Sequence, residues 1–92
     1  MKKVTKWDLV SFVLASSYRK KVLSALSTPK TPSAMSKEVS INKTHISRAL
    51  AELEDKGLIK CLTPNSKKGK IYSIQDIGKE TLAEVNRVNK KI

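Results

Sequence analysis

The chain has 92 residues, of which 39% are hydrophobic, and its 19 Lys and Arg against 8 Asp and Glu give a formal net charge of +11. A chain of this length forms one domain, residues 1–92, whose small core leaves little room for the large cavity of an enzyme. The hydrophobic content excludes wholesale disorder, and no apolar run approaches the roughly 20 residues that span a membrane.

The positive charge is unevenly distributed along the chain. Neither residues 9–37 nor residues 56–75 contain any Asp or Glu. A pI above about 9 marks a candidate nucleic-acid binder, so this asymmetry favours a basic face that meets a nucleic acid. The alternative is that the surface lysines only keep the protein soluble.

The N-terminus is basic and precedes an apolar stretch at residues 9–15, as in signal peptides. Basic residues follow the stretch instead of a small-residue cleavage site, so we expect no signal sequence and a cytoplasmic, nucleoid-associated protein. One cysteine, Cys61, and one histidine, His45, cannot form an internal disulfide or a zinc site within one chain. We expect no cofactor and no metal, and we expect Cys61 to be a small strand hydrophobe rather than a redox sensor.

Two helices are predicted first along the chain. Residues 5–15 are apolar nearly all round, which predicts a helix buried within the chain or against another chain. Ser16 or Ser17 is a suitable N-cap for a second helix over residues 17–27, and the basic run 19–21 lies off its apolar face. That face follows helical spacing and consists of Tyr18, Val22, Leu23 and Leu26.

A loop over residues 27–32 leads to a pair of helices joined by a short turn. Ser33 is expected to cap a short helix over residues 33–39, and Asn42 is expected to cap a helix over residues 43–56. The apolar residues of this last helix recur at i, i+3, i+4 and i+7 and are Ile46, Ala49, Leu50 and Leu53.

A β-hairpin and a final helix complete the predicted order. Gly57 ends the helix before it, and the hairpin is expected to have strands at residues 58–63 and 70–74. A helix from residue 76 follows, with Ile77, Leu82, Val85, Val88 and Ile92 on a loose stripe. The sequence therefore predicts a mainly α fold with a small β-hairpin (α+β), built on a helix-turn-helix.

The segment from Ser33 to Ile59 resembles the winged helix-turn-helix of ArsR/MarR-like transcription regulators, of the small lysine-rich type common in archaea. The residues that carry the resemblance are Ile46-Ser47-Arg48, the spaced leucines after them and Gly57-Leu58-Ile59. Residues 72–79 are similar to the junction before the last helix, although Gln75 stands where the family more often has Thr. The resemblance implies a winged helix-turn-helix with extra N- and C-terminal helices.

The polar face of the helix at residues 43–56 is the expected contact with double-stranded DNA, because an α-helix fits the major groove. Arg48 can form a bidentate pair with guanine, worth roughly 1–3 kcal/mol of discrimination. The alternative is a solvated charge or a pair with Glu52. Thr44 and His45 can reach base edges, although His45 can also be a neutral surface residue. Further expected contacts, mostly with phosphates, are Ser33, Lys37, Asn42, Lys43 and Ser47, with Lys30 as an addition.

The turn of the hairpin, residues 64–70, corresponds to the wing of the resembled family. It contains three lysines, Lys67, Lys68 and Lys70. A basic tip beside the groove would bind the DNA backbone or enter the minor groove. The alternative is an ordinary polar turn with solubilising lysines.

The first and last helices, within residues 1–16 and 76–92, are expected to form a homodimer. Several apolar positions at the C-terminus are spaced close to a coiled-coil seam, in which an Asn can fix the register. The expected interface residues are Trp7, Phe12, Leu82, Val85, Asn89 and Ile92. Two-fold symmetry would place the two recognition helices about 34–36 Å apart. The alternative is that both helices pack within the monomer.

Three functions remain open from the sequence. A sequence-specific dimeric DNA-binding regulator is favoured by Arg48 and its polar neighbours, whereas the high charge on a small domain favours a nonspecific nucleoid protein. A winged helix used for protein or RNA contact would not depend on the polar face of residues 43–56. We expect no enzymatic activity, because no catalytic motif is visible, and we see no small-molecule effector and no membrane partner.

Overall fold

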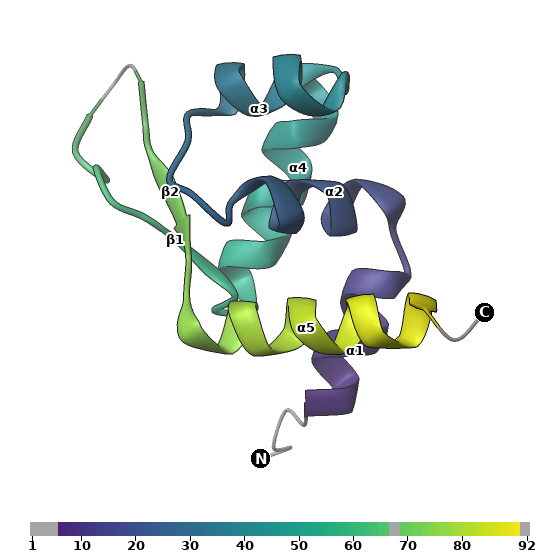
Figure 1. Ribbon diagram of the computed structural model, residues 1–92. Helices are drawn as coiled ribbons and strands as arrows, with labels where there is room; N and C mark the ends of the chain where they lie inside the picture. Colours follow the sequence, from purple (N-terminus) through teal and green to yellow (C-terminus); the bar gives the residue numbers. More distant parts are fainter. Residues whose placement is uncertain (1–5, 67–68, 91–92) are drawn as a thin grey trace.

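The computed structural model describes residues 6–66 and 69–90, apart from the side chains of residues 89 and 90 (Figure 1). Its elements are α1 (Lys6–Leu14), α2 (Ser17–Ala25), α3 (Pro32–Val39), α4 (Lys43–Asp55), β1 (Ile59–Cys61), β2 (Tyr72–Ile74) and α5 (Asp76–Lys90). This order confirms the predicted α+β fold with a helix-turn-helix and a hairpin. No helix in the described part of the chain combines the length and apolarity needed to cross a membrane.

The helices α2 and α3 begin at residues whose side chains accept backbone N–H bonds. Ser16 caps α2 as predicted, at 3.4 Å. The predicted cap of α3 is wrong, because Thr31 rather than Ser33 accepts the N–H of Ala34, at 3.2 Å. Pro32 occupies the first helical position, where its fixed φ and missing N–H are tolerated, so Ser33 falls inside the first turn.

The helix α4 begins and ends where the sequence predicts. The side chain of Asn42 accepts the N–H of Thr44 at 2.9 Å and caps the helix. At the other end, Gly57 has a φ of 75°, the left-handed conformation that glycine adopts without a steric penalty. These two ends set the length of the helix that carries most of the predicted site.

The turn between α3 and α4 is held by two hydrogen bonds between the same residues. The hydroxyl of Ser36 donates to the carbonyl of Ile41 at 2.6 Å, and the N–H of Ile41 donates back to the carbonyl of Ser36 at 3.3 Å. Ser40 between them adopts a left-handed conformation with a φ of 55°, and Ile41 is buried. The angle between the two helices of the motif is therefore fixed locally.

One hydrophobic core joins all five described helices and the hairpin. The four apolar residues predicted for α4 are all buried, which confirms that face of the helix. The core residues are Leu9, Val10, Val13, Val22, Leu23, Ala25, Leu26, Met35, Ile41, Ile46, Ala49, Leu50, Leu53, Leu58, Ile59, Ile74 and Val85. The helix α2 lies across α4 at the centre of the molecule, with α3 at one end and α1 with α5 at the other (Figure 1).

The hairpin is bound on its outer side by a residue of the loop before α3, which the sequence did not predict. The strands β1 and β2 are antiparallel, with Ile59 opposite Ile74. Lys30 then pairs with Tyr72 through two backbone hydrogen bonds of 3.1 and 2.9 Å. The wing is thus connected to the start of the helix-turn-helix as well as to α4.

The helices α1 and α5 pack against each other and cross at the end of the molecule opposite α3 (Figure 1). The ammonium group of Lys6 lies 3.3 Å from the carboxylate of Glu84, which joins the two helices. The two terminal helices therefore contact each other within the monomer, as the alternative to the dimer expected.

Candidate nucleic-acid interface

The residues predicted to read DNA form an exposed strip along α4. Because the buried residues occupy one side of the helix, the opposite side presents the polar ones to solvent. The exposed residues that the sequence assigned to DNA are Asn42, Lys43, Thr44, His45, Ser47 and Arg48. The positive end of the α4 dipole and the charge of Lys43 make this end of the strip suited to a phosphate.

Arg48 is free to bind a partner. Among residues 6–66 and 69–90 its guanidinium makes no ion pair or hydrogen bond, and its attraction to Glu52 is only a longer-range one. The alternative of a close pair between Arg48 and Glu52 is therefore wrong, because another arginine occupies the carboxylate. An exposed guanidinium on the polar side of a helix retains its full hydrogen-bonding capacity for a partner.

The arginine that holds Glu52 is Arg19 of α2. Its guanidinium donates to both carboxylate oxygens, at 2.9 and 3.3 Å, and to the backbone carbonyl of Phe12 at 2.8 Å. It also lies 3.9 Å from the centre of the Phe12 ring, at cation–π distance. Arg19 therefore joins α1, α2 and α4, and its hydrogen bonds lower the pKa of Glu52. The guanidinium of Arg19 is therefore engaged within the chain and is not free for another partner.

Tyr18 extends the exposed strip from α4 onto α2. The sequence placed Tyr18 on the apolar face of α2, but its exposed fraction is 39% and that assignment is wrong. Its ring stacks on the ring of His45, with centroids 4.6 Å apart and planes at 18°. No periodicity in the sequence could reveal this pair, because it joins the first turns of two helices that are distant in sequence.

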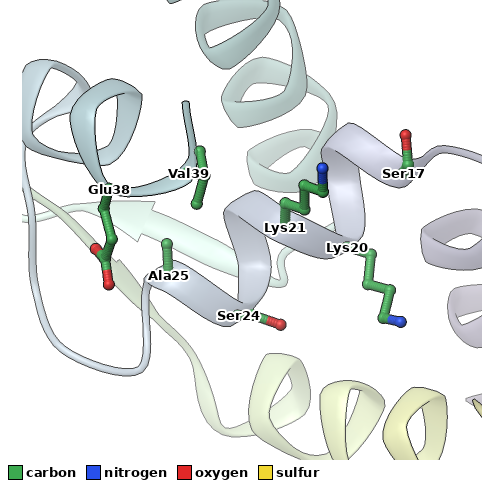
Figure 2. Close-up of a pocket in the computed structure, with 7 residues that line it drawn as sticks. All are labelled: Ser17, Lys20, Lys21, Ser24, Ala25, Glu38 and Val39. Atoms are coloured by element: carbon green, nitrogen blue, oxygen red, sulfur yellow. The ribbon is translucent and has the colours of Figure 1, made fainter. Parts of the chain in front are cut away.

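Two hollows are lined partly by α2, and the first of them borders the strip. One, of about 260 Å³, is lined by Ser16, Tyr18, Arg19, His45, Arg48, Ala49 and Glu52. The other, of about 450 Å³, lies between α2 and the end of α3 and is shown in Figure 2, where Ala25 and Val39 point toward each other and Lys20 points away. Within the described residues no group of three or more His, Cys, Asp or Glu could hold a metal ion.

Three of the remaining predicted DNA contacts are described, on α3 and on the wing. Ser33 and Lys37 are exposed at opposite ends of α3. Lys70 is exposed on the wing, whereas Lys67 and Lys68 lie outside the described residues.

Lys30 is not free for a phosphate, because it bonds groups of its own chain. Its ammonium group donates to the carbonyl of Ala25 and to the hydroxyl of Thr28, the latter at 2.8 Å, and lies 3.3 Å from Glu38. The suggested phosphate contact of Lys30 is therefore wrong.

The described residues of the predicted dimer interface differ widely in exposure. Trp7 has an exposed fraction of 63%, whereas Val85 is fully buried in its own chain, so its assignment to an interface is wrong. Phe12 and Leu82 are half-buried against the core of the same chain. The predictions for Asn89 and Ile92 concern side chains outside the described part of the structure.

Comparison with known proteins gives a match in structure but none in sequence. No family model matches the chain, and no curated protein matches it. A MarR family regulator from Neisseria meningitidis superimposes with a TM-score of 0.72 at 20% identity, over 94% of this chain and 61% of that chain. The transcriptional regulator BldR from Sulfolobus solfataricus gives a TM-score of 0.74 at 22% identity, over 92% of this chain and 66% of that chain.

A third similar structure matches along nearly its whole length. TubR bound to 24 bp of tubC, from Bacillus thuringiensis serovar israelensis, gives a TM-score of 0.79 at 14% identity, over 95% of this chain and 98% of that chain. The chain spans less than two thirds of the Neisseria regulator and of BldR, at 61% and 66% of their lengths. Taken with the helix-turn-helix and the hairpin, these matches establish that the chain has the winged-helix fold of the MarR-family transcription regulators.

Proposed function

We propose that this protein is a transcription regulator that binds double-stranded DNA sequence-specifically as a homodimer. The observation that carries the proposal is the exposed guanidinium of Arg48 on α4, which pairs with no group among the described residues. Two of the similar structures support it, since one is a MarR family regulator and the other, TubR, was determined bound to 24 bp of tubC.

In this proposal α4 enters the major groove with its exposed strip against the base edges. Arg48 donates two hydrogen bonds to a guanine, the commonest specific contact of an arginine with DNA. Thr44 and His45 reach neighbouring base edges, while Ser47 and Lys43 bind phosphates. Because Arg19 neutralises Glu52, the carboxylate at the edge of the strip repels the DNA less than a free one would.

The wing and α3 contribute contacts with the DNA backbone. Lys37 on α3 and Lys70 on the wing are exposed cations that supply affinity without sequence information. The tip of the wing, with Lys67 and Lys68, lies on the backbone or in the minor groove. The net charge of +11 favours association with DNA in general, so specificity must come from α4.

The homodimer forms through α1 and α5. Trp7 and Leu14 on α1 are large hydrophobic side chains with substantial exposure, which a second chain would cover. In Figure 1 the crossing of α1 and α5 lies at the opposite end of the molecule from α3, so a contact there leaves the start of α4 free. A two-fold axis through this end would present two α4 helices about one DNA turn apart.

The experiment that tests the proposal is the selection of bound duplexes from a random DNA pool at about 150 mM salt. Three proteins are compared: the wild type, Arg48→Ala and, as a matched control, Lys79→Ala, which removes one exposed charge from α5. We expect a two-fold symmetric motif from the wild type and the control. In Arg48→Ala we expect one position in each half-site to lose its preference, at a cost of roughly 1–3 kcal/mol on the preferred site.

Each other outcome contradicts a specific part of the proposal. An identical motif from wild type and Arg48→Ala would contradict base readout by Arg48. Binding without any motif would favour a nonspecific nucleoid protein, which the high net charge also suits. No retained DNA would favour a winged helix that contacts protein or RNA.

A further inference from the structure

The stacked pair of Tyr18 and His45 joins two helices at the edge of the exposed strip. Tyr18 lies in the first turn of α2 and His45 in the first turn of α4, and both side chains are exposed. The ring centroids are 4.6 Å apart and the planes are inclined by 18°, so the rings are stacked. Such offset stacking is favourable beyond the area that it buries.

The stack is not needed to hold α2 against α4. Val22 and Leu23 of α2 are fully buried in the core that they share with α4. The pair of Arg19 and Glu52 adds a second link between the same helices, with a shortest contact of 2.9 Å. Because these contacts already fix the helices, the main effect of the stack is to restrict the side chain of His45.

The restriction matters because His45 and Arg48 line the same hollow. They lie three residues apart on α4 and so project from neighbouring positions of the helix surface. Tyr18 lines this hollow from the α2 side. A ring that is held on one face keeps its edge, which carries both nitrogens, directed away from the stack and available to a ligand.

We propose that Tyr18 is a positioning residue that holds the His45 ring for contact with a base edge, and so helps to set the DNA sequence that the protein prefers. This inference rests on the proposed DNA-binding function. A side chain that is ordered before binding loses less conformational entropy in the complex, which corresponds to roughly two- to tenfold in affinity. The surface that recognises the DNA sequence then includes Tyr18 of α2, although Tyr18 itself touches no base.

A double-mutant cycle on the selected duplex tests the proposal. The proteins are wild type, Tyr18→Ala, His45→Ala, the double variant and Tyr18→Phe, which retains a ring for stacking. Ser17→Ala is the matched control, because Ser17 is exposed in the same turn of α2. Affinities are measured by fluorescence anisotropy for the selected duplex and for duplexes with single base-pair changes.

We expect Tyr18→Ala and His45→Ala to relax the preference at the same base pair, each by roughly two- to tenfold. We expect the double variant to be no weaker than His45→Ala alone, since Tyr18 acts through His45. Tyr18→Phe and Ser17→Ala should behave as wild type. A merely structural role of Tyr18 would instead weaken all duplexes equally and would persist in the absence of His45.

A second measurement follows the stack without DNA. The chain has one histidine, so the ring signals of His45 in an NMR spectrum are unambiguous. We expect the Tyr18 ring to shift them, and we expect the shift to be lost in Tyr18→Ala and kept in Tyr18→Phe. Unchanged ring signals in folded Tyr18→Ala would overturn the proposal.

The proposed role of Tyr18 and the proposed DNA-binding function are contradicted by different results. If the wild type selects a motif but Tyr18→Ala and His45→Ala have additive effects on affinity, only the proposed role of Tyr18 is overturned. A wild type that selects no motif would overturn the proposed sequence-specific function and, with it, the inference that depends on that function.

Discussion

Gly78, in the first turn of α5, lies directly against the backbone of the segment that precedes β1. A Cβ atom added there would lie 2.1 Å from the carbonyl oxygen of Leu58 and 2.7 Å from Cγ1 of Ile74. The same carbonyl accepts the N–H of Gln75 at 2.9 Å, so it cannot move without loosening the junction between β2 and α5. Glycine is thus required here by close packing, and its φ is not in the left-handed region.

We expect Gly78→Ala to lower the free energy of unfolding by roughly 1–3 kcal/mol, as for other insertions of a methyl group into a packed site. Urea unfolding followed by circular dichroism measures this change. Asn86→Ala is the control, because Asn86 is exposed on the same helix and alanine is the better helix former. A Gly78→Ala variant as stable as wild type would contradict the described contact between α5 and Leu58.

Among the helices, the pair of Arg19 and Glu52 is a polar link between α2 and α4. The hydrogen bonds from Arg19 lower the pKa of Glu52 from its ordinary value of 4.5. A carboxyl group with a lowered pKa in the folded state stabilises the fold at pH values above its unfolded pKa. That contribution is lost as the pH falls below 4.5 and through the lower pKa of the folded protein.

We therefore expect Glu52→Gln to be less stable than wild type at neutral pH and to lose less stability on acidification below pH 4.5. Unfolding by urea at a series of pH values compares the two proteins. Glu54→Gln, an exposed change on the same helix, should retain the acid dependence of the wild type in this range. Parallel pH profiles for wild type and Glu52→Gln would show that the bond to Arg19 contributes nothing to stability.

The sequence predicted the elements well because their signals are local. The apolar spacing of α4, the caps Ser16 and Asn42 and the turn at Gly57 all act within a few residues, and each is observed. The cap of α3 was misassigned by two residues, although a proline at the first helical position already indicates that the cap precedes it.

The long-range contacts of the site could not be predicted in the same way. Arg19 and Glu52 are 33 residues apart, and neither the pairing of Lys30 with Tyr72 nor the stack of Tyr18 on His45 has a periodic signature. These contacts determine which basic side chains are bonded within the chain and which remain available to a partner. The sequence therefore predicted the face of α4 but not the residues of α2 that support it.

In a dimer of this protein, the interface residues must differ from those that the sequence predicted. Spacing alone assigned Val85 to the interface, but Val85 fills the core of its own chain. Among the predicted interface residues whose side chains the structure describes, the exposed one is Trp7 on α1. A dimer that uses this end of the molecule would therefore be centred on α1 rather than on a seam along α5.

We expect Trp7→Glu to convert the proposed dimer into a folded monomer, because it places a charge in the proposed interface without disturbing the core. Sedimentation velocity over a range of concentrations measures the mass of the species. Leu62→Glu, the same kind of change at a hydrophobic residue with an exposed fraction of 44% on the hairpin side, should remain dimeric. Equal masses for wild type and Trp7→Glu would contradict an interface on α1.

Every proposed contact with DNA depends on α4 being the surface that binds it. The measurement that tests it most directly is an NMR titration of the labelled protein with the selected duplex, because it reports on each residue separately. We predict that the largest amide shift changes fall on residues 42–51 of α4 and on Lys70, with small changes on α1 and α5. Changes centred on α1 and α5, with residues 42–51 unaffected by saturating DNA, would contradict DNA binding by α4.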